Sequence, residues 1–84
     1  MDFKTRIEEF IIEELCPAIG IELDHIDEEE SLIDAGIMNS LEILQLLSFI
    51  DEELEIDISG EEIKLENFKN LKTICNYVES LANG

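Results

Sequence analysis

Positively charged side chains are absent from most of this sequence. No lysine or arginine occurs between Arg6 and Lys64, yet this stretch holds all of the 22 acidic residues except Asp2, Glu66 and Glu79. The formal net charge of −17 would repel a phosphate backbone, so nucleic-acid binding is excluded. Because this imbalance exceeds what solubility requires, the natural partner is a protein with a basic surface.

Cysteine, histidine and long apolar runs are also scarce, and each scarcity removes a class of function. Cys16 and Cys75 are too few and too distant in sequence for a disulfide framework or a zinc site, so we expect buried thiols. The only histidine, His25, lies far along the chain from Ser40, which argues against a base-activated serine nucleophile and against an enzyme. Counted from Asp24, the acidic loop lacks the glycine and the alternating acids of an EF-hand, so no metal site is expected.

No apolar run approaches the roughly 18 residues needed to cross a bilayer, and the first residues lack the apolar segment of a signal peptide. We therefore expect a cytoplasmic protein without membrane insertion. With 84 residues, of which 45% are hydrophobic, residues 1–84 should form one small domain with one core.

Apolar spacing predicts an all-α fold. Phe3, Ile7, Phe10, Ile11 and Leu15 recur at steps of three and four, which indicates an amphipathic helix that Pro17 should end. A long connection follows, and its apolar residues have no sustained period, so they should anchor it to the core. They are Ile19, Ile21, Leu23, Ile26, Leu32, Ile33 and Ile37.

Two more long helices and a short one complete the predicted bundle. The second long helix should begin at Ser40 and bury one stripe, while Asn70 can cap the last. Ser59 and Glu62 suggest a short helical turn around Ile63. The stripe of the second helix comprises Ile43, Leu46, Leu47, Ile50 and Leu54; that of the last comprises Leu71, Ile74, Cys75, Val78 and Leu81. The expected architecture is a small bundle of three main helices plus one short helix, with a long loop between the first and second.

The start of the second helix carries the clearest local signal. Asn39 followed three residues later by Glu42 forms an N-cap with a capping-box partner, which makes Ser40 the first helical residue. Its hydroxyl should point outward.

The segment LIDAGIMNSLEIL resembles the prosthetic-group site of acyl and peptidyl carrier proteins. In that family an acidic residue and a glycine lead into Asp-Ser-Leu at a helix start, and the matching positions here are Asp34, Gly36, Asn39, Ser40 and Leu41. The resemblance implies that a phosphopantetheinyl transferase attaches 4′-phosphopantetheine from coenzyme A to the serine. The residues agree with this, because the first turn of a helix offers unpaired N–H groups and a positive dipole end to a phosphodiester.

Two departures from the family pattern bear on the cargo. Asn39 stands where the family usually has aspartate, and two residues, Ile37 and Met38, separate Gly36 from Asn39 where fatty-acid carriers generally have one. The longer spacing is similar to that of D-alanyl and other stand-alone aminoacyl carriers. It implies an adenylating enzyme that activates the cargo and a downstream acyltransferase or synthase. Fatty acid, polyketide and nonribosomal peptide synthesis all stay open, and we expect the carrier to act as a monomer.

The resemblance also implies a docking face, in which apolar Leu41 and Leu44 are ringed by acids that meet basic residues of each partner. Alternatively, Leu44 packs under the short third helix. The candidate docking residues are Asn39, Leu41, Glu42, Leu44, Gln45, Ser48, Asp51 and Glu52. A rival hypothesis for the whole chain is an acidic helical adaptor that binds a basic protein without a prosthetic group.

Overall fold

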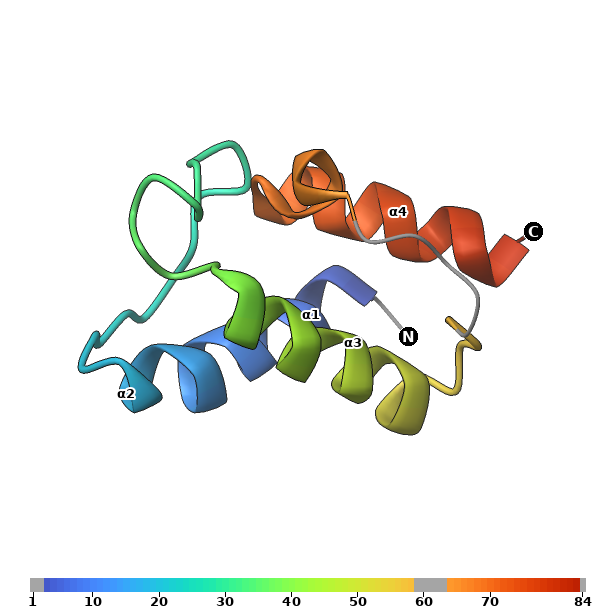
Figure 1. The fold of residues 1–84 in the computed structure, drawn as a ribbon, viewed down its shortest axis with the longest axis horizontal. Coiled ribbons are helices and arrows are strands. Elements are labelled where there is room, and N and C mark those ends of the chain that lie inside the picture. Colours follow the sequence, from blue (N-terminus) through green and yellow to red (C-terminus); the bar gives the residue numbers. More distant parts are fainter. Residues whose placement is uncertain (1–2, 59–63, 84) are drawn as a thin grey trace.

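Three long helical segments and one short 3-10 helix form the described part of the chain (Figure 1). The computed structural model describes residues 3–58 and 64–83. The first segment is continuous and comprises α1 (Phe3–Phe10), a π-helical stretch η1 (Ile11–Leu15) and α2 (Cys16–Ala18). It is followed by α3 (Ser40–Glu53), the 3-10 helix η2 (Leu65–Phe68) and α4 (Leu71–Asn83). The all-α prediction with a long first loop is confirmed, and no helix in these ranges is long and apolar enough to cross a membrane.

The first helical segment runs past Pro17, so the prediction that this proline ends it is wrong. Proline has no N–H, and its ring clashes with the carbonyl four residues earlier in an ordinary α-helix. Here the preceding turn is π-helical, and the N–H of Cys16 donates to the carbonyl of Ile11, five residues back. Such a wider turn is one of the recognised ways for a helix to absorb a local disturbance.

Gly20 is the residue that ends this helix. Its φ of +79° is left-handed, and its N–H donates to the carbonyl of Pro17 at 3.1 Å. The N–H of Ile21 then reaches back to the carbonyl of Cys16 at 2.9 Å. These two bonds form a Schellman motif, in which a glycine after the helix satisfies the last free carbonyls.

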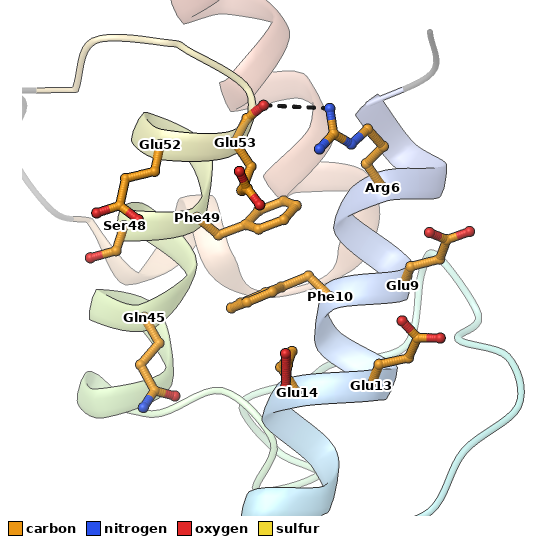
Figure 2. A pocket seen from close by; sticks show the side chains of 10 residues that line it. All are labelled: Arg6, Glu9, Phe10, Glu13, Glu14, Gln45, Ser48, Phe49, Glu52 and Glu53. Atoms are coloured by element: carbon orange, nitrogen blue, oxygen red, sulfur yellow. Dashed lines mark hydrogen bonds between the residues drawn. The ribbon is translucent and has the colours of Figure 1, made fainter.

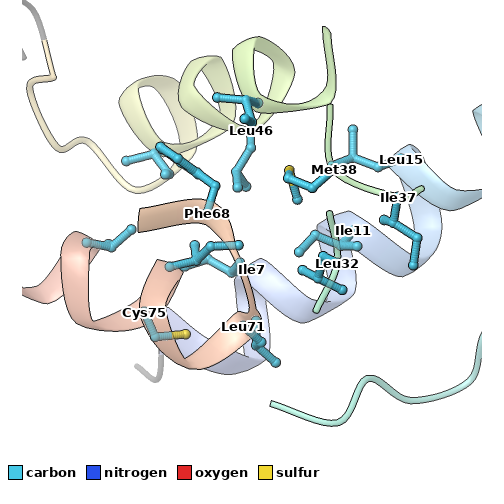
Figure 3. Close-up of a cluster of buried hydrophobic side chains, with 14 of the residues drawn as sticks. Ile7, Ile11, Leu15, Leu32, Ile37, Met38, Leu46, Phe68, Leu71 and Cys75 are labelled. Atoms are coloured by element: carbon cyan, nitrogen blue, oxygen red, sulfur yellow. The ribbon is translucent and has the colours of Figure 1, made fainter. Parts of the chain in front are cut away.

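The core lies where the three long segments meet, and the predicted stripes provide most of it (Figure 3). Among the predicted stripe residues, Phe3, Phe10, Leu54 and Leu81 are only partly buried. Phe68 of η2 is 1% exposed and joins the same cluster, a contact that the sequence did not predict. The buried hydrophobic residues from the three long segments are Ile7, Ile11, Leu15, Cys16, Ile43, Leu46, Leu47, Ile50, Leu71, Ile74, Cys75 and Val78.

The long loop between α2 and α3 is tied to the helices at several points. Ile26, Leu32 and Ile37 are buried as predicted, and Ile21, Leu23 and Ile33 are partly buried against the core, whereas Ile19 is 37% exposed. The N–H of Leu32 donates to the carbonyl of Lys69 at 2.7 Å. The loop therefore has a fixed course into α3.

Glu28 holds the same loop through two different groups. Its carbonyl accepts the N–H of Lys72 at 3.0 Å, and its carboxylate pairs with Lys4 at 2.9 Å. These contacts connect the loop to α4 and α1 at once.

The connection from α3 to η2 includes residues 59–63, where the short turn around Ile63 was expected; they lie outside the described residues. The start of α4 is described in full. Asn70 Oδ1 accepts the N–H of Thr73 at 2.8 Å, and Thr73 Oγ1 accepts the N–H of Asn70 at 3.2 Å. The predicted cap by Asn70 is thus confirmed, in a reciprocal form.

Candidate functional site

The start of α3 is built around the side chain of Asn39. Its backbone is extended, with φ of −125° and ψ of −173°, and its Oδ1 accepts the N–H groups of Leu41 at 3.0 Å and Glu42 at 3.3 Å. The predicted N-cap is confirmed, and Ser40 is the first helical residue.

Ser40 lies where the chain leaves the core. Ile37 and Met38 are 4% and 2% exposed, and both of their N–H groups donate to the carbonyl of Leu32 at 3.0 Å. Asn39 and Ser40 are both exposed. Ser40 therefore lies at the surface, while the backbone just before it is held by two buried side chains and two hydrogen bonds.

The loop residues that lead into this site make a tight turn. Gly36 has φ of +78°, a conformation that glycine adopts without the strain of a side chain. Asp34 is exposed, and its N–H donates to Ser31 Oγ at 3.2 Å. Its carboxylate therefore adds negative charge near the turn without forming part of the cap.

Donor groups remain available around the Ser40 hydroxyl. The N–H groups of Asn39 and Ser40 have no acceptor among residues 3–58 and 64–83, and neither has the side-chain nitrogen of Asn39. Because Oδ1 takes both capping bonds, the group left over on this amide is its NH₂, which can only donate. A phosphodiester offers only acceptor oxygens and a negative charge, so this donor set fits a phosphodiester on Ser40.

Glu42 does not belong to the surface, and its predicted place among the docking acids is wrong. The side chain is 3% exposed, and its Oε1 is buried without a hydrogen-bond partner in the described part of the chain. The reciprocal capping-box bond from the N–H of Asn39 is also missing. Glu42 turns inward beside the buried stripe, where a partner protein cannot reach it.

The other candidate docking residues lie on the surface of α3, facing two ways. Leu41 and Leu44 are 59% and 54% exposed, so packing of Leu44 under a short helix is not seen in the described residues. Asp51 is exposed as well. Gln45, Ser48 and Glu52 instead line a groove between α3 and the first helical segment (Figure 2).

We call this hollow the α1–α3 groove; its volume is about 460 Å³. The rings of Phe10 and Phe49 stack within it, with centroids 4.3 Å apart and an interplanar angle of 20°. The guanidinium carbon of Arg6 lies 5.9 Å from the Phe49 centroid, and its Nη1 donates to the carbonyl of Glu53 at 3.4 Å (Figure 2). Sequence reasoning missed this feature, although Phe49 is an aromatic residue off the buried stripe.

His25 and the two cysteines have other surroundings. His25 Nδ1 lies 3.3 Å from Glu8 Oε2, which also accepts the N–H of Ile26 at 3.0 Å, so this pair holds the loop against α1. Cys16 and Cys75 are buried free thiols, and burial raises the pKa of Cys16 above its usual value of 9.0. A thiol in that state is a poor nucleophile. No cluster of three potential metal ligands occurs within residues 3–58 and 64–83.

Comparison with known proteins gives matches that include this site. A family model described as "Phosphopantetheine attachment site" matches residues 9–78, a range that contains all of α3. A protein named "Acyl carrier protein" from Bdellovibrio bacteriovorus is 28% identical over 79 residues, which are 94% of each chain.

Proposed function

The chain belongs to the phosphopantetheine-binding carrier proteins, a non-catalytic family whose prosthetic group is 4′-phosphopantetheine, and we propose that Ser40 is the residue that bears this group. Family membership favours a carrier over an adaptor that lacks a prosthetic group. We further propose that residues 1–84 act as one carrier unit and that this unit works in the cytoplasm, where it meets its partner enzymes.

The observation that carries the proposal is that Ser40 is exposed and begins a helix whose first N–H donors are not all used. A carboxylate or phosphate near the first turn of a helix is stabilised by about 0.3–1 kcal/mol. Here Asn39 holds the N–H groups of Leu41 and Glu42, which leaves its own NH₂ and two backbone donors for an added anion. The residues of this turn would bind the phosphodiester and hold the end of the arm that is attached to Ser40 in one position.

When attached, the group supplies a thiol at the end of a flexible arm, where an acyl group is held as a thioester. The protein's own task is presentation. Exposed Leu41 and Leu44 offer apolar contact beside Ser40, and Asp51 adds a negative charge on the same helix. A phosphopantetheinyl transferase, an activating enzyme and a downstream acyltransferase or synthase would each bind this face weakly and leave quickly.

An aminoacyl cargo is the second candidate, and one observation favours it: the spacing of two residues between Gly36 and Asn39. Those residues, Ile37 and Met38, also fill the core, so packing gives the spacing a separate reason. Incubating the modified protein with a stand-alone adenylating enzyme, ATP and mixed amino acids would test this idea. Loading that occurs only from acyl donors would contradict it.

Intact mass measurement tests the attachment site. After incubation with coenzyme A and a broad-specificity phosphopantetheinyl transferase, the chain should gain one phosphopantetheine increment. Ser40→Ala should gain none, because the accepting oxygen is gone, while Ser80→Ala on the exposed surface of α4, away from the docking face, should gain it fully. An increment retained in Ser40→Ala would refute the assignment.

Because Asn39 departs from the usual aspartate, several transferases should be compared. If none of them modifies the chain, and a folded state is verified by circular dichroism, the proposal for Ser40 fails.

A further inference from the structure

The α1–α3 groove has a polarity that suits neither the prosthetic arm nor a metal ion. On the side of the first helical segment it carries Glu9 of α1 and Glu13 and Glu14 of η1, and on the α3 side it carries Glu52 and Glu53. These acids would repel the phosphodiester of the arm and any carboxylate cargo. They also lack the arrangement of three ligands that a metal ion needs in the described residues.

The floor of the groove is aromatic, which narrows the class of cation that fits. Phe10 and Phe49 are stacked and only partly buried, so both rings keep exposed area within the groove. A planar guanidinium binds such faces by cation–π attraction and stacking, and it loses less hydration than an ammonium does. Aromatic faces surrounded by carboxylates therefore favour arginine over lysine.

The chain itself demonstrates this chemistry at one end of the groove. Arg6 lies over the Phe49 ring, with Phe10 on the other side of the stack (Figure 2). Arg6, Phe10 and Glu14 follow each other at four-residue steps along one side of the first helical segment. Along the groove the order is thus Arg6, the two stacked rings of Phe49 and Phe10, and then Glu14 (Figure 2), and among the described residues Arg6 is the only cation that lines the groove.

We propose that the α1–α3 groove receives an arginine side chain of a partner protein, whose guanidinium stacks on Phe10 and pairs with Glu14. This proposal rests on the proposed function, because the partners would be the enzymes that act on the carrier. The groove adjoins the docking face through Gln45, Ser48 and Glu52, which line it from α3. One arginine in the groove would fix how a partner lies along α3 relative to Ser40.

The size and charge of the groove agree with this occupant. About 460 Å³ falls within the range of roughly 300–1,000 Å³ for ligand sites, which is enough for an arginine and its neighbours. A second copy of this chain is a poor occupant, because its net charge of −17 would oppose association.

The test adds two capped peptides, Ala-Arg-Ala-Arg-Ala or Ala-Lys-Ala-Lys-Ala, to the full chain at low salt. NMR measures the chemical-shift changes of the protein and the affinity for each peptide. Shifts on arginine-peptide binding should be largest at the rings of Phe10 and Phe49. The arginine peptide should bind at least about two-fold more tightly than the lysine peptide, as a weak exposed cation–π contact allows. Shifts spread over the acidic surface, or equal affinity for both peptides, would overturn the proposal.

Matched variants distinguish binding in the groove from general electrostatic attraction to the acidic surface. Glu14→Gln and Glu29→Gln remove the same charge from exposed positions, but only Glu14 lines the groove. Glu14→Gln should weaken arginine-peptide binding by about two- to five-fold, the range of an exposed ion pair, whereas Glu29→Gln should change it much less. Equal losses in the two variants would refute the groove as a specific site.

Phe10→Leu keeps an apolar side chain and removes the π face, so it should abolish the preference for arginine over lysine; a preference that survives in a folded Phe10→Leu protein would contradict the proposal. Modification of Ser40 is measured by intact mass on the unaltered chain. In that chain, normal modification without binding of the arginine peptide would refute the groove proposal alone, whereas binding of the arginine peptide without modification would refute the attachment at Ser40 alone.

Discussion

The helices α3 and α4 both begin after an asparagine, but the two helix starts are completed differently. At α4, Asn70 and Thr73 exchange hydrogen bonds, so the backbone N–H of Asn70 has an acceptor in Thr73 Oγ1. At α3, Asn39 caps two N–H groups, and Glu42 gives no bond in return. The first helical residue is fully buried Leu71 in one case and exposed Ser40 in the other.

This difference separates a helix start that serves stability from one that can serve binding. A reciprocal cap satisfies the free donors of the first turn within the protein. A cap that is only half made leaves donors that an anion can use. In this chain the incomplete cap surrounds Ser40, the serine proposed to bear the prosthetic group, and the complete cap lies at the start of α4, which anchors the loop.

The largest expected effect comes from removing the complete cap. Asn70→Ala should lower the free energy of unfolding by about 1–2 kcal/mol, because Asn70 is partly buried and water cannot fully replace its bonds. Asn39→Ala should cost less, about 0.5–1 kcal/mol, since its exposed site is open to water. Urea unfolding of both variants measures the difference, and a larger loss for Asn39→Ala would reverse the comparison.

The second prediction concerns Glu42, whose inward turn leaves the cap of α3 incomplete. Glu42→Met should raise the free energy of unfolding by about 1 kcal/mol. A buried oxygen without a partner costs about 1–3 kcal/mol, which exceeds the 0.3–1 kcal/mol that a carboxylate gains near a helix N-terminus.

Glu79→Met is the matched control, because it makes the same chemical change at an exposed position of α4. Its stability should change by less than about 0.5 kcal/mol. Equal changes in the two variants would show that general charge relief, rather than burial of Glu42, is responsible.

The smallest effect is expected for Asn39→Asp, which keeps the capping oxygen and replaces the free NH₂ with a second anionic oxygen. Before modification the free energy of unfolding of the variant should be higher by about 0.3–1 kcal/mol, because a negative charge at the start of α3 interacts favourably with the helix dipole. After modification this gain should shrink or vanish, because the carboxylate would face the phosphodiester instead of donating to it. Melting temperatures of both proteins, each with and without the group, measure the effect; a gain that is unchanged by modification would contradict a donor role for Asn39.

Features that depend on neighbours in sequence could be predicted well. The stripes of α3 and α4 and the caps at Asn39 and Asn70 follow from spacing and residue type alone. The end of the first segment could also have been found, because Gly20 is a stronger signal than Pro17 for the close of a helix. The π-helical turn that accommodates Pro17 has no such signal in the sequence.

Features that depend on packing between segments could not be predicted. Glu42 lies at the edge of the buried stripe, and whether it turns inward depends on what packs beside α3. The stacking of Phe10 on Phe49 likewise requires knowing that α1 lies next to α3, which helical periodicity does not reveal. The attachment motif was therefore readable from the sequence, while the groove became visible only in three dimensions.

The buried pair before the site, Ile37 and Met38, has a mechanical consequence. Both side chains sit in the core and both N–H groups donate to the carbonyl of Leu32, so Ser40 follows two residues after a firmly packed anchor. A tether attached to Ser40 would start from this anchor. Movement of the cargo from one enzyme to the next would then depend on the tether and on rotation of the whole protein rather than on displacement of the backbone before Ser40.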